Sequence, residues 1–311
     1  MTQFFTNFYT VFVQVFVLFL LMGFGFAGNK AKMISEEGSK VISEIVMYFV
    51  TPCLIINSFN IPFDREHLNG LLICFVAFFT VMAVSAGLVH IIFRGKDKQK
   101  LRVLRFATIF SNVGYMGIPL QEAVLGHEGV FYGSACVAVF NIVLWTYGIA
   151  SSSGTVRALS VKKLIFNPGI IGVSIGLILF FFSVSLPEPV DKTLGFMAGL
   201  NTPLAMMVIG FNLAGSNFLA SFKRFSTYAV IALRLVIIPL AALFVLVLCG
   251  VKGDVLVSLV IASSAPVAAV TTVFAVKFEN DIKTSVNLVA ISTLLSIFTM
   301  SAIVALAQIF Q

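Results

Sequence analysis

The sequence contains few charged residues. Asp, Glu, Lys and Arg together make up 11% of its 311 residues, whereas hydrophobic residues make up 59%, and the mean hydropathy is +1.05. About a quarter of the residues of a soluble globular domain are charged. The composition therefore excludes an ordinary soluble domain and predicts that most of the chain lies in the lipid bilayer.

Cysteine and histidine are also scarce, and neither is arranged as a set of ligands. The four cysteines lie in apolar segments without a CxxC pair, and the three histidines are scattered along the chain. This spacing favours packing over a disulfide framework or a metal site. The sequence also lacks the HExxH and Walker patterns, so we expect no catalytic residues, no enzyme activity, no cofactor and no metal.

Long apolar runs are abundant instead. A helix needs about 20 apolar residues to cross a bilayer, and ten segments approach or exceed that length. We therefore predict an all-α polytopic membrane protein. The ten predicted spans are 8–27, 39–60, 68–93, 103–125, 129–150, 166–184, 191–214, 225–249, 254–276 and 284–309.

The distribution of Lys and Arg predicts the orientation. With the N-terminus placed outside, 16 of the 20 basic residues fall in or beside the inner loops, among them Arg94 to Arg105, and only Arg65, Lys192 and Lys252 fall outside. Basic residues concentrate on the cytoplasmic side of membrane proteins. We therefore expect a protein of the cytoplasmic membrane with both termini extracytoplasmic. The net charge of +7 follows from this topology and does not indicate nucleic-acid binding.

Two of the spans contain matched interruptions. The first break is Phe110 to Pro119 (FSNVGYMGIP), and the second break is Ala262 to Ala269 (ASSAPVAA). Backbone freed by such small, polar and helix-breaking residues is tolerated at membrane depth only inside protein or beside a cavity. A matched pair of interrupted segments is the best sequence indication of a transporter's binding site.

Other features repeat between the two halves. Thr-Pro occurs only as Thr51-Pro52 and Thr202-Pro203, each in mid-span, and the first break and Pro266 follow them at similar distances. The offset of about 150 residues places five spans in each half, and an odd number inverts the second half relative to the first. We predict one five-helix repeat over 1–150, a cytoplasmic linker over 151–165 and an inverted repeat over 166–311.

The order of these residues resembles the auxin efflux carrier family, which includes the plant PIN-type carriers. The resemblance is carried by the first break, by Ser264-Ala265-Pro266 with Val273 to Lys277, and by Arg234 to Pro239. It covers essentially the whole chain and fits bacterial members. Plant carriers have a proline where this chain has Ser111, so the first break depends here on Ser111, Asn112, Gly114 and Gly117.

This resemblance implies a bile acid:sodium symporter-like or NhaA-like fold. Spans 1, 2, 6 and 7 would form a scaffold domain, with helix breaks at Pro52 and Pro203. Spans 3–5 and 8–10 would form a mobile transport domain that moves by an elevator-type mechanism. Spans 4 and 9 would cross near the membrane midplane. The resemblance further implies a homodimer joined through the scaffold domains.

The two breaks predict an anion site. Each break exposes the N-terminus of a half-helix, whose N–H groups carry partial positive charge and bind anions without a lysine. An Asn112 amide would add a donor for a carboxylate. The predicted substrate-binding residues are Ser111, Asn112, Val113, Gly114, Ala265, Pro266 and Val267. The family resemblance adds Asn141 as a substrate-facing residue of the fifth span.

Several alternatives remain open at this point. Asn112 could bind substrate or only cap the broken helix. Arg234, within the eighth span, could attract the anion or neutralise the carbonyl ends of the half-helices. Those carbonyls could instead hold a cation such as Na⁺, while H⁺ is the other possible coupling ion. The favoured function is a secondary carrier of a small organic anion, of auxin-like or dicarboxylate type. A sodium-coupled bile-acid-type symporter and a non-transporting membrane sensor are the alternatives.

Overall fold

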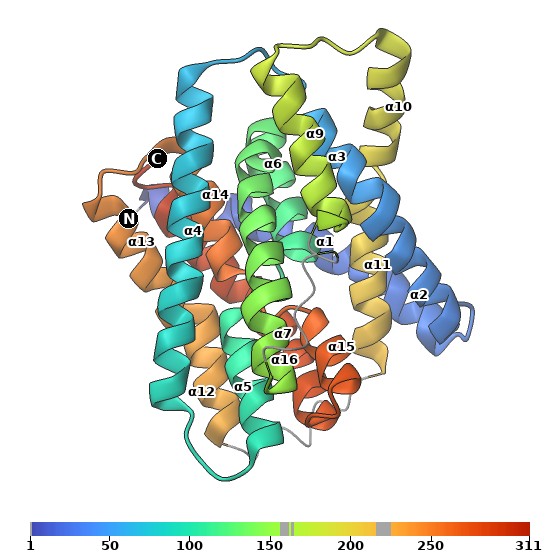
Figure 1. Cartoon of the computed structure of the whole chain (residues 1–311), viewed down its shortest axis with the longest axis vertical. Helices are drawn as coiled ribbons and strands as arrows, with labels where there is room; N and C mark the ends of the chain where they lie inside the picture. The colour runs from blue at the N-terminus through green and yellow to red at the C-terminus, as the bar shows by residue number, and fades with distance from the viewer. Residues whose placement is uncertain (1, 156–161, 163–164, 216–224) are drawn as a thin grey trace.

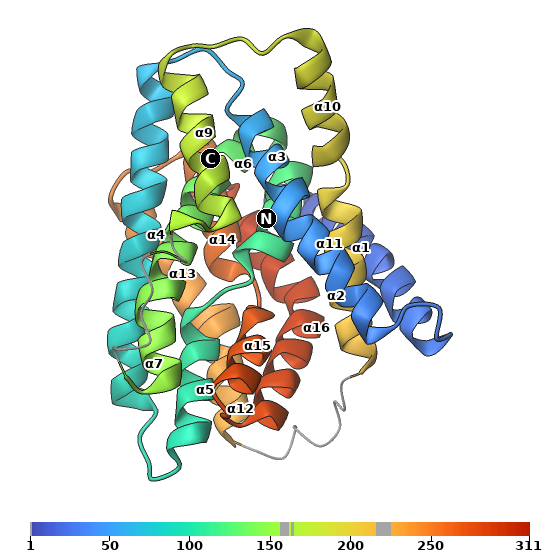
Figure 2. The same ribbon diagram turned by 45° about the vertical axis from the view of Figure 1, so that its right-hand side comes forward.

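The computed structural model describes residues 2–155, 162, 165–215 and 225–311, and all regular elements within them are helical. Figures 1 and 2 show these helices as one elongated bundle. Seven of the described helices are long and apolar enough to cross a membrane, and two further apolar helices are shorter. An all-helical polytopic membrane protein is therefore confirmed at this level of detail.

The first half of the chain contains two long uninterrupted helices, α1 and α4, and several interrupted ones. In chain order its elements are α1 (Thr2–Lys30), α2 (Glu36–Ile45), η1 (Val46–Val50), α3 (Thr51–Ser58), α4 (Arg65–Ile92), α5 (Lys98–Ile109), η2 (Val113–Gly117), α6 (Ile118–Val143), η3 (Leu144–Gly148) and α7 (Ile149–Ser153). The predicted spans 103–125 and 129–150 are joined within α6, which kinks at Gly126 with φ +65°. A positive φ is accessible to glycine at little cost, so one residue makes the turn between them.

The second half shows similar interruptions and closes with another long helix. Its elements are α9 (Pro168–Phe181), α10 (Glu188–Ala198), α11 (Asn201–Ala214), α12 (Phe225–Ala232), η6 (Leu233–Ile237), α13 (Ile238–Leu248), α14 (Gly253–Ser264), α15 (Val270–Lys277) and α16 (Ile282–Ala307). The predicted linker 151–165 begins inside α7, and its residues 156–161, 163 and 164 lie outside the described part of the chain.

Four of the interruptions in the described helices are turns of π-helix. Three of them, η1, η2 and η6, are each followed two residues later by a proline, namely Pro52, Pro119 and Pro239. Proline lacks an N–H, and its ring collides with the carbonyl four residues earlier. A wider turn accommodates that collision without ending the helix. The prolines therefore explain these π turns, whereas η3 has no such proline.

Two groups of helices pack closely. In the first group α1 lies against α11, and α3 lies against α9 and α10; in the second group α4, α6 and α14 contact one another, and α14 also contacts α16. The close contact of α1 with α11 depends on glycine. A Cβ on Gly25 would stand 1.9 Å from the Met207 carbonyl oxygen, and a Cβ on Gly210 would stand 1.9 Å from the Met22 carbonyl oxygen. Small residues bring membrane helices together in this way. The groups also touch, because α1 packs on α16.

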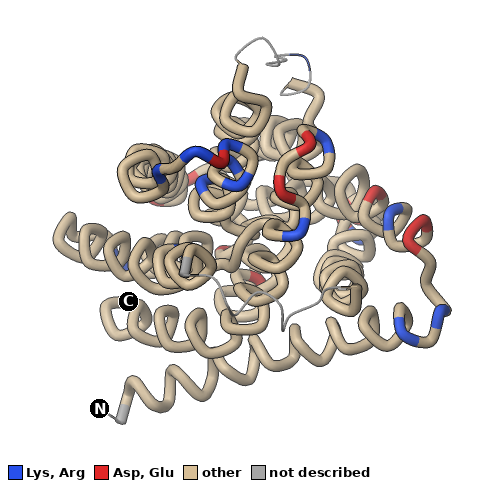
Figure 3. Tube along the Cα trace, turned by 90° about the horizontal axis from the view of Figure 1, so that it is seen from below, with Lys and Arg blue, Asp and Glu red and all other residues tan. Residues whose placement is uncertain are grey.

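Polar residues begin several helices, and basic residues gather at one end of the bundle. Asp64, Asp97 and Asp281 each accept a hydrogen bond from a backbone N–H of the helix that follows, which satisfies a donor that has no partner inside the helix. Viewed from below (Figure 3), Lys and Arg cluster where α4 meets α5, and others lie where α1 meets α2. The connections from α3 to α4 and from α9 to α10 lie at the opposite end (Figure 1).

Candidate functional site

The two breaks meet in the interior of the protein. Ser111 and Val267 form an antiparallel β-bridge. The Asn112 N–H donates to the Pro266 carbonyl oxygen over 2.7 Å, and the Ala268 N–H donates to the Phe110 carbonyl oxygen over 2.9 Å. We call this paired backbone, residues 110–113 and 265–268, the crossing. Segments some 150 residues apart in the sequence are thus held together by main-chain hydrogen bonds.

Local sequence explains why both helices stop there. After α5 the chain turns to an extended conformation at Phe110, and after α14 it does so at Ala265. Proline disfavours helical geometry in the residue before it, so Pro266 accounts for the extended Ala265. On the other side, Asn112 and Gly114 are poor helix formers. Each freed backbone group then needs a new partner, and the opposite break supplies several of them.

Arg234 binds the C-terminal ends of both half-helices. Its side chain is 2% exposed. Its guanidinium donates to the carbonyl oxygens of Thr108 and Ile109 at the end of α5. It also donates to the carbonyl oxygen of Ser263 at the end of α14. A cation at helix C-termini offsets their partial negative charge. Of the two roles left open by the sequence, the contacts of Arg234 match neutralisation of the carbonyl ends.

The N-terminal ends of the half-helices are partly open. Several N–H groups at the crossing are already used, since Val267 donates to the Ser292 hydroxyl over 3.1 Å. The next residues after each segment of the crossing are different. No hydrogen bond among the described residues uses the N–H groups of Gly114, Tyr115, Ala269 and Val270. All four residues are partly exposed. Of these four donors, Gly114 belongs to the predicted set, whereas Tyr115, Ala269 and Val270 were not predicted from the sequence.

Asn112 stands between the crossing and these donors. It precedes η2, yet its side chain makes no capping hydrogen bond and no other hydrogen bond with the described residues. The residue is 4% exposed. Nearby, the buried Ser111 hydroxyl also has no hydrogen-bond partner among the described residues. The geometry thus lacks the capping bond of the alternative interpretation and leaves an amide free to meet a ligand.

Open space adjoins the first of these half-helices. A Cβ built on Gly114 meets no heavy atom within 4 Å. Acidic side chains are absent from both breaks. Chemically, this surface offers hydrogen-bond donors and partial positive charge, which suits an anion more than a cation.

The other predicted site residues lie around the crossing. The Asn141 amide donates to the Val137 carbonyl oxygen over 2.9 Å and lies beside Gly169 of α9. Its neighbour Phe140 contacts Phe110 edge-to-face, with ring centroids 5.6 Å apart. Asn141 therefore sits near the crossing, between α6 and α9.

The two Thr-Pro pairs are adjacent in space. The Thr51 hydroxyl donates to the Asn201 side-chain oxygen over 3.0 Å, which places Pro52 and Pro203 in neighbouring helices. Both prolines lie at the start of a helix, Pro52 after a π turn and Pro203 after the break that separates α10 from α11. They mark interruptions outside the crossing.

Two polar contacts between the helix groups were not predicted from the sequence. The Ser43 hydroxyl of α2 lies 2.9 Å from the Tyr115 hydroxyl of η2. The Thr202 hydroxyl of α11 donates to the Glu122 carboxylate of α6 over 3.1 Å. Glu122 is the only acidic residue of the predicted span 103–125, and this was the one available signal for the second contact. The first pair gives no signal, because Ser and Tyr are common in membrane helices.

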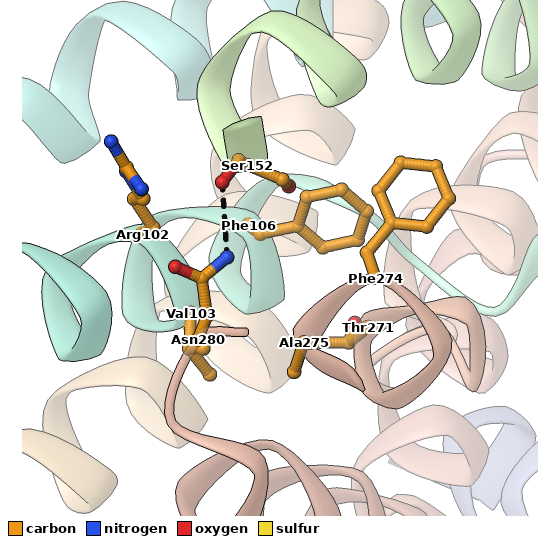
Figure 4. Close-up of a pocket in the computed structure, with 8 residues that line it drawn as sticks. All are labelled: Arg102, Val103, Phe106, Ser152, Thr271, Phe274, Ala275 and Asn280. Atoms are coloured by element: carbon orange, nitrogen blue, oxygen red, sulfur yellow. Dashed lines mark hydrogen bonds between the residues drawn. The ribbon is translucent and has the colours of Figure 1, made fainter. Parts of the chain in front are cut away.

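A small cavity lies beside the N-terminal half of α5 (Figure 4). It holds about 10 Å³ for water centres, enough for one water molecule and too little for an organic anion. The Asn280 amide donates across it to the Ser152 carbonyl oxygen over 3.0 Å. Its lining residues are Arg102, Val103, Phe106, Ser152, Thr271, Phe274, Ala275 and Asn280. Among the described residues, no group of three His, Cys, Asp or Glu side chains is arranged to hold a metal ion.

Comparisons with known proteins agree with this architecture. The family model described as membrane transport protein matches residues 10–156 and 152–304. An uncharacterized transporter of Methanocaldococcus jannaschii is 27% identical over 300 residues, covering 92% of this chain and 96% of the relative. An uncharacterized transporter of Methanothermobacter thermautotrophicus is 26% identical, covering 93% and 94%. A candidate malonate transporter of Rhizobium meliloti is 25% identical, covering 65% and 66%.

Proposed function

Because the chain belongs to the membrane transport protein family, the family of the auxin efflux carriers, we propose that it is a secondary transporter of a small organic anion. It moves a carboxylate across the cytoplasmic membrane by alternating access. The observation that carries this proposal is the pair of half-helix N-termini at the crossing, with free N–H groups at Gly114, Tyr115, Ala269 and Val270.

These donors favour a carboxylate over other ligands. N–H groups at helix N-termini bind anions through hydrogen bonds and the helix dipole together. The unpaired Asn112 amide supplies two more N–H donors, and both oxygens of a carboxylate are acceptors. No acidic residue of either break opposes an anion. The relative described as a candidate malonate transporter supports a dicarboxylate as the first substrate to test.

Alternating access needs two bodies that move relative to each other. We propose that α1, α2, α3, α9, α10 and α11 form the scaffold domain and that α4 to α7 and α12 to α16 form the transport domain. The contacts of α1 with α11 and of α3 with α9 and α10 support the first group, and those of α14 with α4, α6 and α16 support the second. The transport domain carries the crossing and moves as an elevator.

Ten spans in a 5+5 inverted repeat fit these helices. The seven long helices become ten spans when the two shorter apolar helices are counted and α6 is divided at Gly126. An odd number of spans in each half gives the inverted arrangement common among secondary transporters. The cluster of Lys and Arg between α4 and α5 supports a cytoplasmic position for that end, with both chain termini outside. We further propose that two copies associate through their scaffold domains.

Binding of malonate by variants of the purified protein tests the site. Asn112→Ala should weaken malonate binding about 10- to 100-fold, because a hydrogen bond to a charged group contributes about 1.5–3 kcal/mol. Gly114→Val should weaken it as well, because its side chain fills the open space beside the free donors. The measurement is isothermal titration or thermal shift with malonate in detergent.

Asn212→Ala is the matched control. Asn212 lies exposed on α11, so its loss removes the same chemical group far from the crossing and should leave malonate affinity unchanged. Wild-type malonate affinity in both Asn112→Ala and Gly114→Val would refute the crossing as the anion site.

A further inference from the structure

Glu122 makes a hydrogen bond between the two proposed domains. It lies on α6, one turn beyond η2, and its partly buried carboxylate accepts from the Thr202 hydroxyl of α11 over 3.1 Å. Within the described residues Glu122 takes part in no ion pair. A carboxylate inside a membrane helix is costly and usually functional, yet the anion site does not use it.

The donor in this contact is held firmly on the scaffold side. Thr202 follows Asn201 at the start of α11, and the Asn201 side chain accepts a hydrogen bond from Thr51 of α3. Asn201 is 1% exposed. The hydroxyl therefore belongs to a fixed junction between α3 and α11, whereas Glu122 belongs to the helix that continues from the crossing.

Few charges face Glu122 from the helices that pack against α6. The helices α3, α9 and α11 contain no charged residue, and α1 contains only Lys30 at its far end. On α14 the only charged residue is Asp254, in its first turn. On α4 the charged residues and histidines are Arg65, Glu66 and His67 at the start, with His90 at the end, and Cys74 lies between them. His67 is already bonded to Asp64 and Glu128. On α6 itself, His127 and Glu128 follow Glu122 in the sequence.

Movement of the transport domain would break this bond. Glu122 would leave Thr202 behind, and an ionised carboxylate without a donor is strongly disfavoured in an apolar interior. A bound proton removes that charge, so the transport domain moves past the scaffold domain with Glu122 protonated and not with Glu122 ionised. The reverse movement returns Glu122 to Thr202 and releases the proton to water.

We propose that Glu122 is the proton-binding site that couples domain movement, and hence transport, to the proton gradient. This inference rests on the proposed function, because it requires the scaffold and transport domains to move past each other. It assigns the coupling ion as H⁺, and it assigns to Glu122 a role distinct from holding the substrate.

Distance measurements by pulsed electron paramagnetic resonance test the coupling without substrate. Spin labels go on Lys192→Cys of α10 and Lys252→Cys before α14, both at exposed positions, in a background lacking Cys53 and Cys249. In the wild-type background the ratio of the two conformations should change with pH between 5.5 and 8, by up to about tenfold per pH unit for one proton. Glu122→Gln should keep the low-pH distribution at both pH values.

Thr202→Val is the matched control, because it removes the donor and keeps the titrating carboxyl group. It should retain a pH-dependent ratio with a shifted midpoint. A wild-type distribution that is independent of pH would overturn the proposal, and so would a pH dependence that persists unchanged in Glu122→Gln.

Transport measurements separate this proposal from the substrate proposal. In proteoliposomes, Glu122→Gln should still exchange labelled malonate at equilibrium but should lose stimulation of malonate uptake by a proton gradient. Gradient stimulation that survives in Glu122→Gln would overturn the coupling role. A protein that fails to bind malonate, but whose pH-dependent distances are lost in Glu122→Gln, would exclude malonate as the substrate while supporting Glu122.

Discussion

At the scale of single residues, two polar side chains at the crossing differ in their hydrogen bonding. Arg234 is bonded to three carbonyl oxygens at the C-terminal ends of α5 and α14, whereas Asn112 makes no side-chain hydrogen bond with the described residues. The arginine therefore holds the structure, and the asparagine is available to a ligand. Both are nearly fully buried, so burial alone does not distinguish a structural residue from a binding residue.

The sequence indicated both residues but not this division. A charge in the eighth span is unusual whatever its partner, which is why Arg234 was recognisable. Its partners lie 125 to 126 residues earlier and 29 residues later in the chain, and no local pattern specifies that encounter. For the same reason the free N–H groups at Ala269 and Val270 were not predicted. The N–H groups nearest Pro266 already donate hydrogen bonds within or beside the crossing.

Replacing Arg234 should destabilise the protein. Arg234→Met leaves three buried carbonyls without their donor, and we expect a loss of about 2–4 kcal/mol. Arg234→Lys should lose less, because an ammonium group can still reach some of the carbonyls. The measurement is thermal unfolding in detergent, monitored by tryptophan fluorescence or by aggregation. Unchanged stability in Arg234→Met would contradict the structural role, whatever happens to transport.

At the scale of helices, interruptions and close contacts follow different rules. The interruptions depend on local sequence, because Pro52, Pro119, Pro239 and Pro266 each disturb the helical turn that precedes them. The sequence therefore indicated the interruptions at Pro52, at 110–119 and at 262–269, whereas it gave no indication of those at Leu144–Gly148 and Leu233–Ile237. It did not predict that three of these prolines would produce π turns rather than ends, since that outcome depends on packing around the widened turn. It also gave no sign that Gly25 and Gly210, far apart in the chain, support one helix contact.

Gly25→Ala should weaken the packing of α1 against α11. The new methyl group would collide with the Met207 backbone, and overpacking of this kind costs about 1–3 kcal/mol. Gly23→Ala is the control, because a Cβ on Gly23 meets no heavy atom within 4 Å, and it should leave stability unchanged or slightly raised. The measurement is thermal unfolding of both variants under the same conditions. Equal melting temperatures would argue against a close contact at Gly25.

At the scale of the whole molecule, the sequence predicted that basic residues collect on one side of the membrane. Basic residues between the fourth and fifth helices, at 94–105, were assigned to one side of the membrane from their number alone, and in the structure they gather at one end of the bundle (Figure 3). Other residues of that assignment, Arg157, Lys163, Lys223 and Arg224, lie outside the described part of the chain. Which end faces the cytoplasm is an expectation from charge.

Cysteine accessibility in intact cells tests that orientation. A single cysteine at Lys98→Cys, exposed at the start of α5, should resist a membrane-impermeant maleimide until the cells are permeabilised. A single cysteine at Lys192→Cys, exposed on α10, should react before permeabilisation. Both variants need a background without Cys53 and Cys249. The opposite pattern would reverse the proposed orientation and place both termini in the cytoplasm.

The hydrogen-bonded backbone at Ser111 and Val267 has a consequence for how related proteins diversify. In the proposed site the carboxylate of the substrate binds to the main-chain N–H groups of Gly114, Tyr115, Ala269 and Val270, which the paired backbone holds in position. Most side-chain substitutions leave a main-chain N–H group unchanged. The remainder of the cargo meets side chains such as those at positions 113–115 and 268–270. A change of substrate would therefore require only a few side-chain replacements around unchanged main-chain donors. Relatives that handle different acids should diverge at these positions while retaining the same backbone geometry.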